Sequence, residues 1–295
     1  MTLNQILYFI ELCKTRKFTA AAANLYISQS TLSYEIAKLE EELGTSLFIR
    51  TPNKMLEMTE AAQLFREKAE PGLRLLEEAK NDVLSLNNDI SGKVTIGFFF
   101  GTGMTVVPEI LTSFYSEYEN TKIDIRTKVF HKWTNLPALL ENGECDLIIS
   151  ADQAGKGFSS IRMAEQPVVC CVPADHPFAQ CGFIRIQDLE KETVILPSFN
   201  SNLDRKVKEL FRKNDISARI IYCDDWISQQ LQIVSGKGLG LQTETYMNDQ
   251  YLKMIRIEDE DAVIPLYVSW PVNRRMSRAV ETVRDFIIRE RQKTN

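Results

Sequence analysis

The chain has 295 residues, of which 44% are hydrophobic and 25% charged, so a disordered or low-complexity chain is excluded. No uncharged apolar run reaches the roughly 18–20 residues that cross a bilayer, and the first residues form an amphipathic pattern instead of a signal peptide. We therefore expect a cytosolic protein of two or three domains. The formal net charge of −5 argues mildly against a nucleic-acid partner, so any DNA-binding role must come from a local surface.

The six cysteines and two histidines limit the metal and redox chemistry available to the chain. No cysteine pair has C-x-x-C spacing, and two histidines are too few for a histidine-rich metal site, so the sequence predicts neither a metal nor a cofactor. Scattered cysteines in a reducing compartment are usually small core residues. The cysteines are Cys13, Cys145, Cys170, Cys171, Cys181 and Cys223.

The first 58 residues predict a winged helix-turn-helix. Apolar residues at helical spacing predict helices over about 3–14, 20–25 and 29–43. Two short apolar runs, at 47–49 and 55–58, then predict small strands around a turn. Three short helices followed by a hairpin are the elements of that fold.

Capping residues support these helix boundaries. Thr2 and Gln5 fit a capping box for the first helix. Thr19 is the predicted N-cap of the second helix and Ser28 that of the third. Gly44 is the expected C-terminal stop of the third helix.

The third helix has an apolar back and a polar front. Short hydrogen-bonding groups of this kind suit base edges and phosphates in a major groove, and Arg50 at the start of the hairpin suits a backbone phosphate. We therefore predict a DNA-binding face made of Ser28, Gln29, Ser30, Thr31, Ser33, Tyr34, Lys38 and Arg50.

An ordered pattern over about 45 positions resembles the signature of LysR-type transcriptional regulators. The resemblance implies that Ser28, Gln29, Thr31 and Ser33 lie on the recognition helix and that Arg50 contacts phosphate at the wing. Two residues depart from the family pattern, Ser30 where a proline is common and Tyr34 where a longer polar or basic residue is frequent. The pattern comprises Phe18 to Ala22, Leu25, Ser28, Gln29, Leu32, Ser33, Ile36, Leu39, Glu40, Leu43, Gly44, Leu47, Phe48, Arg50, Leu56, Thr59 and Ala61.

The DNA-binding segment is electroneutral, because residues 1–58 carry six basic and six acidic groups. One copy should bind DNA weakly through charge alone. We infer that tight binding needs two or more copies on one DNA, as in dimeric helix-turn-helix proteins.

Residues 59–90 predict a linker and dimerisation helix. Apolar residues recur there at alternating steps of four and three, the spacing of a seam for a partner helix, and Pro71 predicts a kink. An amphipathic helix packed on its own chain is the alternative. The predicted seam is Phe65, Ala69, Gly72, Leu76, Ala79, Val83, Leu86 and Ile90.

Residues 91–295 alternate between strand and helix, which predicts a mostly parallel α/β architecture. Two chain crossings, near 162–167 and 262–267, divide it into lobe I (91–163 and 267–295) and lobe II (164–266). This organisation describes a periplasmic-binding-protein-like effector domain. The LysR resemblance continues here through weaker motifs, Asp175-His176-Pro177 and the glycines from 236 to 240.

Ligands in open α/β sheets bind beyond the carboxyl ends of the strands. The family resemblance implies an effector pocket between the lobes, lined by residues at those ends; ordinary helix capping and turn chemistry is the alternative. The predicted effector residues are Gly101, Thr102, Gly103, His131, Ser150, Ser198, Phe199, Asn200 and Thr243.

These features predict a transcriptional regulator whose partners are double-stranded DNA, a small-molecule effector and itself, as a dimer with a tetramer preferred, and no membrane. No hydrolase elbow, phosphate loop or zinc-protease motif indicates an enzyme. A transport binding protein would need export and would lack residues 1–58. The remaining alternative is a redox sensor of the same architecture that uses lobe II cysteines, for which Cys171 and Cys181 are candidates.

Overall fold

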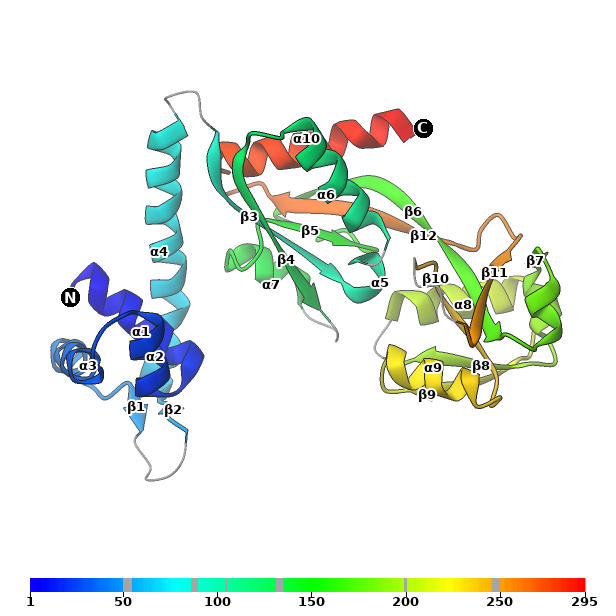
Figure 1. The fold of residues 1–295 in the computed structure, drawn as a ribbon, viewed down its shortest axis with the longest axis horizontal. Helices are drawn as coiled ribbons and strands as arrows, with labels where there is room; N and C mark the ends of the chain where they lie inside the picture. The colour runs from blue at the N-terminus through cyan, green and yellow to red at the C-terminus, as the bar shows by residue number, and fades with distance from the viewer. Residues whose placement is uncertain are drawn as a thin grey trace. The chain divides into compact units, whose positions relative to one another are not determined.

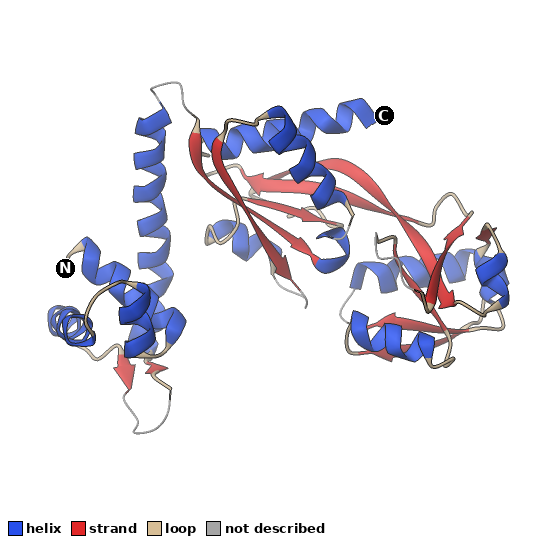
Figure 2. Cartoon of the chain, viewed as in Figure 1, coloured by secondary structure: helices blue, strands red, loops and turns tan. Residues whose placement is uncertain are grey.

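The computed structural model describes residues 1–49, 55–85, 90–103, 105–130, 135–198, 201–245 and 250–294. The chain divides into two compact units, Met1–Leu84 and Ser85–Asn295. The first unit is mainly helical and the second mixes helices with strands (Figure 2). Among the described residues, no helix combines the length and apolar character that crossing a membrane requires.

The first unit consists of three short helices, a two-stranded wing and one long helix (Figure 1). The two wing strands pair antiparallel, with Phe48 opposite Met58. The elements are α1 (Leu3–Thr15), α2 (Phe18–Asn24), α3 (Gln29–Leu43), β1 (Phe48–Ile49), β2 (Glu57–Met58) and α4 (Glu60–Ser85).

Three of the predicted caps are present. The Thr2 amide donates to Gln5 Oε1 at 2.8 Å and the Gln5 amide donates back to Thr2 Oγ1 at 3.2 Å, completing the capping box. Ser28 caps α3 by accepting from the Thr31 amide at 3.0 Å. Gly44 ends α3 in the left-handed conformation, at φ 68°.

The predicted cap at Thr19 is wrong. The helix α2 begins at Phe18, and Lys17 is the capping residue, without a side-chain hydrogen bond. The Ala21 amide donates to the Lys17 carbonyl at 3.0 Å, so Thr19 already lies inside the first turn. Phe18 packs against the core of the unit, so burial of an aromatic side chain accompanies a start without a side-chain cap.

The apolar back of α3 holds it against the rest of the first unit. Leu32, Ile36 and Leu39 are fully buried and belong to one core cluster with Phe9 of α1 and Leu47 before the wing. Burial of three aliphatic side chains at about 1.5–3 kcal/mol each fixes the rotation of the helix about its axis. The polar face of α3 therefore points to solvent.

The second unit has two lobes, each with its own sheet. Lobe I contains β3 (Ser91–Phe99), α5 (Phe100–Gly103), α6 (Val106–Glu117), β4 (Lys122–Phe130), α7 (Leu136–Glu141), β5 (Leu147–Ser150) and α10 (Arg278–Thr294). Lobe II contains β7 (Phe183–Ile184), β8 (Thr193–Pro197), α8 (Ser201–Lys213), β9 (Arg219–Cys223), α9 (Trp226–Val234), β10 (Leu239–Thr243) and β11 (Leu252–Ile257). Two strands connect the lobes, β6 (Phe158–Pro173) and β12 (Val263–Pro271).

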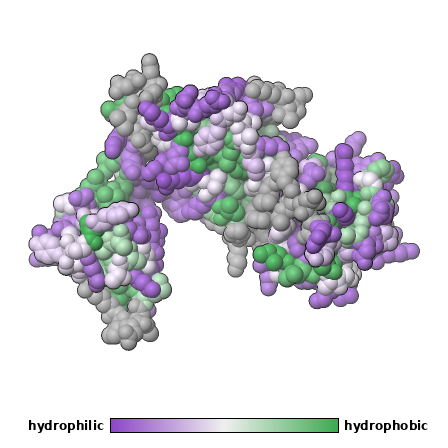
Figure 3. Space-filling view, in the orientation of Figure 1, coloured by the Kyte–Doolittle hydropathy of each residue, from purple (hydrophilic) through white to green (hydrophobic). Residues whose placement is uncertain are grey.

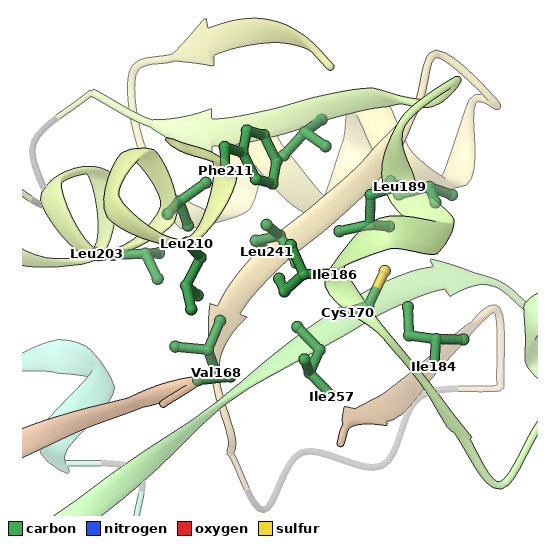
Figure 4. Close-up of a cluster of buried hydrophobic side chains, with 14 of the residues drawn as sticks. Val168, Cys170, Ile184, Ile186, Leu189, Leu203, Leu210, Phe211, Leu241 and Ile257 are labelled. Carbon is green, nitrogen blue, oxygen red and sulfur yellow. The ribbon is translucent and has the colours of Figure 1, made fainter. Parts of the chain in front are cut away.

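The strand order is β4-β3-β5-β12-β6-β10-β8-β9, with β11 pairing β6 and β7. The first part of β6, 158–167, pairs antiparallel with β12, while residues 168–173 pair with β10 and β11. Each lobe has a separate core, and that of lobe II is drawn in Figure 4. The partly buried Ala151 packs against both cores, so it lies where the lobes meet.

Several strands and turns differ from the predicted elements. The strand β6 begins at Phe158, whereas the sequence predicted a strand from Val168. Its first part was not predicted because polar and charged residues interrupt the apolar ones and leave no continuous apolar run. The short strands β7 and β11 were not predicted. Residues Phe100–Gly103 form a one-turn helix of their own, and β10 already begins at Leu239, inside the glycine-rich motif.

Gly238 is a position where a side chain has no room. A Cβ atom there would lie 2.3 Å from the backbone carbonyl oxygen of Thr193, which belongs to the parallel neighbour of β10. We expect Gly238→Ala to lower the free energy of unfolding by about 1–3 kcal/mol, since backbone cannot move aside as a side chain can. Denaturant unfolding measures this loss.

The matched control is Gly182→Ala in the same lobe, where a Cβ would meet nothing within 4 Å. This variant should unfold with the midpoint of the original protein. Equal midpoints for the two variants would contradict the close approach at Gly238.

Candidate nucleic-acid interface and effector cleft

The outward face of α3 carries the predicted DNA-binding side chains. Ser28, Gln29, Ser30 and Thr31 are exposed, and Ser33 is half-buried. The Ser28 hydroxyl lies 2.8 Å from both the Ser30 and the Thr31 hydroxyls, so the hydroxyls form one hydrogen-bonded group at the helix start. Among the described residues, Gln29 makes no side-chain hydrogen bond, which leaves its amide available to a base edge.

Tyr34 and Lys38 form a pair one turn further along α3. The Lys38 ammonium lies 4.7 Å from the centre of the Tyr34 ring. The hydrogen bond with the Tyr34 side chain raises the pKa of Lys38, so its positive charge is secure. Tyr34 is 58% exposed, which makes the pair a cationic and aromatic contact surface.

Three acidic groups of the first unit brace its own elements. Glu35 accepts a hydrogen bond from Gln5 Nε2 at 2.9 Å, and Glu11 accepts one from Asn24 Nδ2 at 2.7 Å. Glu40 Oε1 accepts from the amides of Leu47 and Phe48, at 2.6 and 3.2 Å, and so ties α3 to the start of the wing. Arg50, the predicted phosphate contact of the wing, lies outside the described residues.

The structure brings two predicted effector residues together across the lobes. A Cβ atom on Gly101, just after β3, would lie 2.8 Å from the Thr243 hydroxyl at the end of β10. Both Thr102 and Thr243 are buried polar residues. Gly103 packs against the Phe98 ring in the same turn. The carboxyl ends of one strand from each lobe therefore meet, as ligand sites in open α/β sheets require.

Gln166 joins this group although the sequence did not single it out. Its side chain, 3% exposed on the crossing strand β6, donates to the Gly101 carbonyl at 3.3 Å and to Thr105 Oγ1 at 2.5 Å. A buried amide needs such partners. The available signal for this residue was a single glutamine within the predicted crossing segment 162–167, but sequence periodicity does not say which face of the strand it occupies.

A second contact between the lobes starts at Ser150. The Ser150 hydroxyl donates to the Asp152 carbonyl at 2.7 Å, and the Asp152 carboxylate pairs with Arg205 of α8 at 2.8 Å. Both members of the ion pair are exposed, so water screens it. Arg205 is a basic side chain at this contact between the lobes that the sequence analysis missed, because it lies on a helix and not at a strand end.

The remaining predicted effector residues are not joined to this group. Ser198 is exposed, and its amide donates to the Cys223 carbonyl at 2.8 Å. No hydrogen bond among the described residues joins it to Gly101 or Thr243. His131, Phe199 and Asn200 lie outside the described residues. A hollow of about 790 Å³ lies elsewhere in the unit, between α6, α10 and β6, and none of the predicted residues that the structure describes lines it.

The helices α4 and α9 each expose apolar side chains. On α4, Leu64, Leu75, Leu76 and Val83 are exposed, whereas Phe65 and Ala69 pack against the core of their own unit. The predicted seam is thus covered at Phe65 and Ala69 and open at Leu76 and Val83, while its Leu86 lies outside the described residues. The helix α4 runs without a break through Pro71.

On α9, Ile227 and Leu231 are 64% and 66% exposed and lie one turn apart. Apolar surface gathers over this helix in Figure 3. Exposed apolar stripes of this kind are typical of protein interfaces.

Burial makes most of the thiols poor nucleophiles. It raises the pKa of Cys13 and of Cys145 to about 12 and that of Cys223 to about 11. It also raises the pKa of Cys170, which lies in the core of lobe II (Figure 4). Cys181 is exposed, and all six cysteines are free thiols. In the described part of the chain, no three His, Cys, Asp or Glu side chains cluster as metal ligands would.

Comparison with known families gives two matches that together span most of the chain. Residues 3–63 match the model of the bacterial regulatory helix-turn-helix protein of the lysR family. Residues 87–292 match the model of the LysR substrate binding domain. The chain belongs to the LysR family. It is a LysR-type DNA-binding transcriptional regulator with an effector-binding domain, and the family consists of transcriptional regulators, which are not enzymes.

Curated relatives match this chain over different shares of its length. An uncharacterised HTH-type transcriptional regulator of Bacillus subtilis, YybE, is 28% identical over 98% of each chain. The transcriptional dual regulator OxyR of Escherichia coli is 28% identical over 66% of this chain and 63% of its own length.

Solved LysR structures share the fold. Full-length CbnR complexed with its target DNA has a TM-score of 0.77 at 18% identity, covering 98% of this chain and 99% of its own. The effector binding domain of QuiR in complex with shikimate has a TM-score of 0.58 at 22% identity, covering 69% of this chain and 98% of its own. The predicted fold class, a winged helix-turn-helix followed by a two-lobe α/β domain, is confirmed.

Thiol reactivity should follow the pKa values. A thiolate is the reactive form, and thiols with a pKa of about 11 or 12 are almost fully protonated at pH 8. We expect one fast equivalent of thiol reagent at pH 8, from the exposed Cys181, with the thiols of Cys13, Cys145, Cys170 and Cys223 reacting only on unfolding or as the pH approaches their raised pKa values.

Stopped-flow titration with a chromogenic disulfide measures the fast equivalent, and Cys181→Ser is the control that should abolish it. A fast reaction at Cys170 or Cys223 in the folded protein would contradict the burial described here.

Proposed function

We propose that this LysR-type regulator reads DNA with the exposed face of α3 and is switched by a small molecule held between lobes I and II. The division that accompanies this proposal is residues 1–58 for DNA binding, 59–90 for the linker and 91–295 for effector binding. The lobes are 91–163 with 267–295, and 164–266. A change in the angle between the lobes alters the spacing of paired DNA-binding domains along the operator.

The effector site rests on the approach of Gly101 to Thr243, because it joins strand ends of the two lobes. Gln166 adds a buried amide that bonds to Gly101 and Thr105. A ligand that replaces some of these contacts binds one arrangement of the lobes better than another, which is the requirement for a switch. The complex of QuiR with shikimate supports a small-molecule ligand in this kind of domain.

DNA reading is supported by the exposed groups at the start of α3 and by the complex of CbnR with its target DNA. We assign base contacts to Gln29 and the neighbouring hydroxyls, and phosphate contacts to Lys38 and Arg50. The electroneutral unit favours binding as a pair. Leu75, Leu76 and Val83 on α4 are the exposed apolar groups that a second copy would cover.

A cysteine-based redox sensor is the second candidate. The similarity to OxyR favours it, as does the exposure of Cys181. The raised pKa of Cys170 and Cys223 weighs against it, because the lobe II thiols that burial protonates react slowly with oxidants. We therefore place the small-molecule switch first. We also infer that the chain is not an enzyme, in line with its family.

A gel shift with the DNA upstream of the protein's own operon tests the DNA half of the proposal. We expect Gln29→Ala to lose about 1–3 kcal/mol of discrimination between this DNA and a scrambled duplex, since a bidentate amide contact to a base is removed. Arg50→Ala should weaken binding to both duplexes alike and reduce the salt dependence, because phosphate contacts carry no sequence information.

The matched control is Lys54→Ala in the same segment as Arg50, a cation to which we assign no DNA contact. Equal loss of specific and non-specific affinity in Gln29→Ala would overturn its role in base reading.

The effector half is tested by Gly101→Ala. The added methyl group would meet the Thr243 hydroxyl at 2.8 Å and push the strand ends of the two lobes apart, at a cost of about 1–3 kcal/mol. A metabolite selected because it raises the thermal midpoint of the original protein should lose its effect on the variant.

Gly101→Ala with Thr243→Ala is the matched control, because removing the hydroxyl restores the space and should recover part of the ligand-induced shift. An unchanged shift in Gly101→Ala alone would place the ligand away from this approach.

A further inference from the structure

One thioether in lobe II receives two hydrogen bonds. Met254 Sδ lies 3.6 Å from Gln242 Nε2 and 3.6 Å from Thr245 Oγ1, and both groups donate to it. A thioether sulfur is a weak hydrogen-bond acceptor, and here two polar groups donate to it. Gln242 and Thr245 are both almost fully buried.

A small cavity lies beside this sulfur. It has a volume of about 20 Å³ and is lined by Met254, Cys171, Trp226, Gln230, Gln242 and Thr245, together with Leu252. This is space for about one water-sized molecule. Met254 itself is only partly buried, whereas Cys171 on the facing strand is buried. A small polar oxidant therefore reaches the thioether more readily than the thiol.

We propose that Met254 is a modification site at which a hydroperoxide converts the thioether to a sulfoxide. The sulfur lone pair attacks one peroxide oxygen, an S–O bond forms and the O–O bond breaks. The sulfur is oxidised by two electrons and the peroxide reduced by two. The released hydroxide takes the proton from the oxygen that is transferred, so that hydrogen peroxide yields one sulfoxide and one water. Methionine sulfoxide reductases restore the thioether.

The donors fit the product better than they fit the reactant. With an S–O bond of roughly 1.5 Å and ordinary angles at oxygen, a donor 3.6 Å from the sulfur lies about 2.6–3.0 Å from the sulfoxide oxygen. That range is the usual hydrogen-bond distance, and a sulfoxide oxygen is a stronger acceptor than a thioether. At least one donor must therefore leave the sulfur lone pair as the peroxide oxygen enters, and Gln242 and Thr245 then donate to the oxygen of the forming S–O bond.

The modified atom is connected to the strand end that faces lobe I. Gln242 and Thr245 lie on either side of Thr243, whose hydroxyl approaches Gly101. Gln242 also accepts a hydrogen bond from Gln230 of α9 at 3.0 Å. A sulfoxide at Met254 draws both donors toward itself and so acts on the end of β10 without the participation of any cysteine.

Hydrogen peroxide added to the full-length protein tests the proposal. Peptide mass spectrometry follows the gain of one oxygen at each methionine with time. Met55, which is 56% exposed, sets the rate of a freely accessible thioether, and Met58, partly buried against the core of the first unit, sets that of a shielded one. We expect Met254 to react within about twofold of Met55, because the donors offset its partial burial.

Thr245→Val removes one donor with little change of shape and should slow Met254 at least threefold while the Met55 rate is unchanged. Cys171→Ala separates the two sulfurs and should leave the Met254 rate as it is. Oxidation of Met254 no faster than Met58 in the unmodified protein would overturn the proposal, and so would an unchanged rate in Thr245→Val.

Discussion

The crossing strand β6 is the constraint on which the second unit depends. Residues 158–167 pair with β12 in lobe I, and the same strand continues through 168–173 between β10 and β11 in lobe II. Because one strand is continuous through both sheets, the lobes are joined by its backbone although its pairing partners change at residue 168. The pairing is interrupted at Leu266 and Tyr267, where the register of β12 against β6 shifts. Gln166, which pairs with Ile264 close to that point, is hydrogen-bonded to the Gly101 carbonyl at the end of the lobe I strand β3.

The first unit has few basic groups that are available to contact DNA, and several of its acidic groups hold its own elements together. Glu11, Glu35 and Glu40 each accept hydrogen bonds from another element of the unit. Their charges offset the basic groups, which leaves affinity to shape, hydrogen bonding and the number of copies bound. The helix α4 also has two kinds of surface, since Phe65 and Ala69 pack against the core whereas Leu75 and Leu76 are exposed.

Local signals in the sequence predicted the first unit well because its helices are bounded by their own caps. Thr2 with Gln5, Ser28 and Gly44 each act within a few residues. The start of α2 was missed because no side-chain cap marks it, and the packing of Phe18 against the core that accompanies it is not a local signal. The beginning of β6 was missed because polar residues, Arg162 and Glu165 interrupt its apolar residues, so that it does not look like a core strand.

The contacts between the lobes were harder to predict, since their members come from elements far apart in the sequence. Strand ends are visible in a sequence, and they led to Gly101 and Thr243. Which ends meet depends on the crossing of β6 and β12. Gln166 and Arg205 lie on a strand and a helix and carry no local sign of the cleft. The sulfur contacts of Met254 likewise arise only once β10 and β11 lie on either side of β6.

The bond from Glu40 to the amides of Leu47 and Phe48 has a mechanical consequence. It ties the helix α3 to the base of the wing and so resists independent tilting of the two, which under the proposed function applies when the protein meets a suboptimal operator. Tolerance of such sites must then arise from DNA bending or from the joint between subunits. A DNA-binding unit stiffened in this way adapts less within each half-site and responds more sharply to the distance between the half-sites.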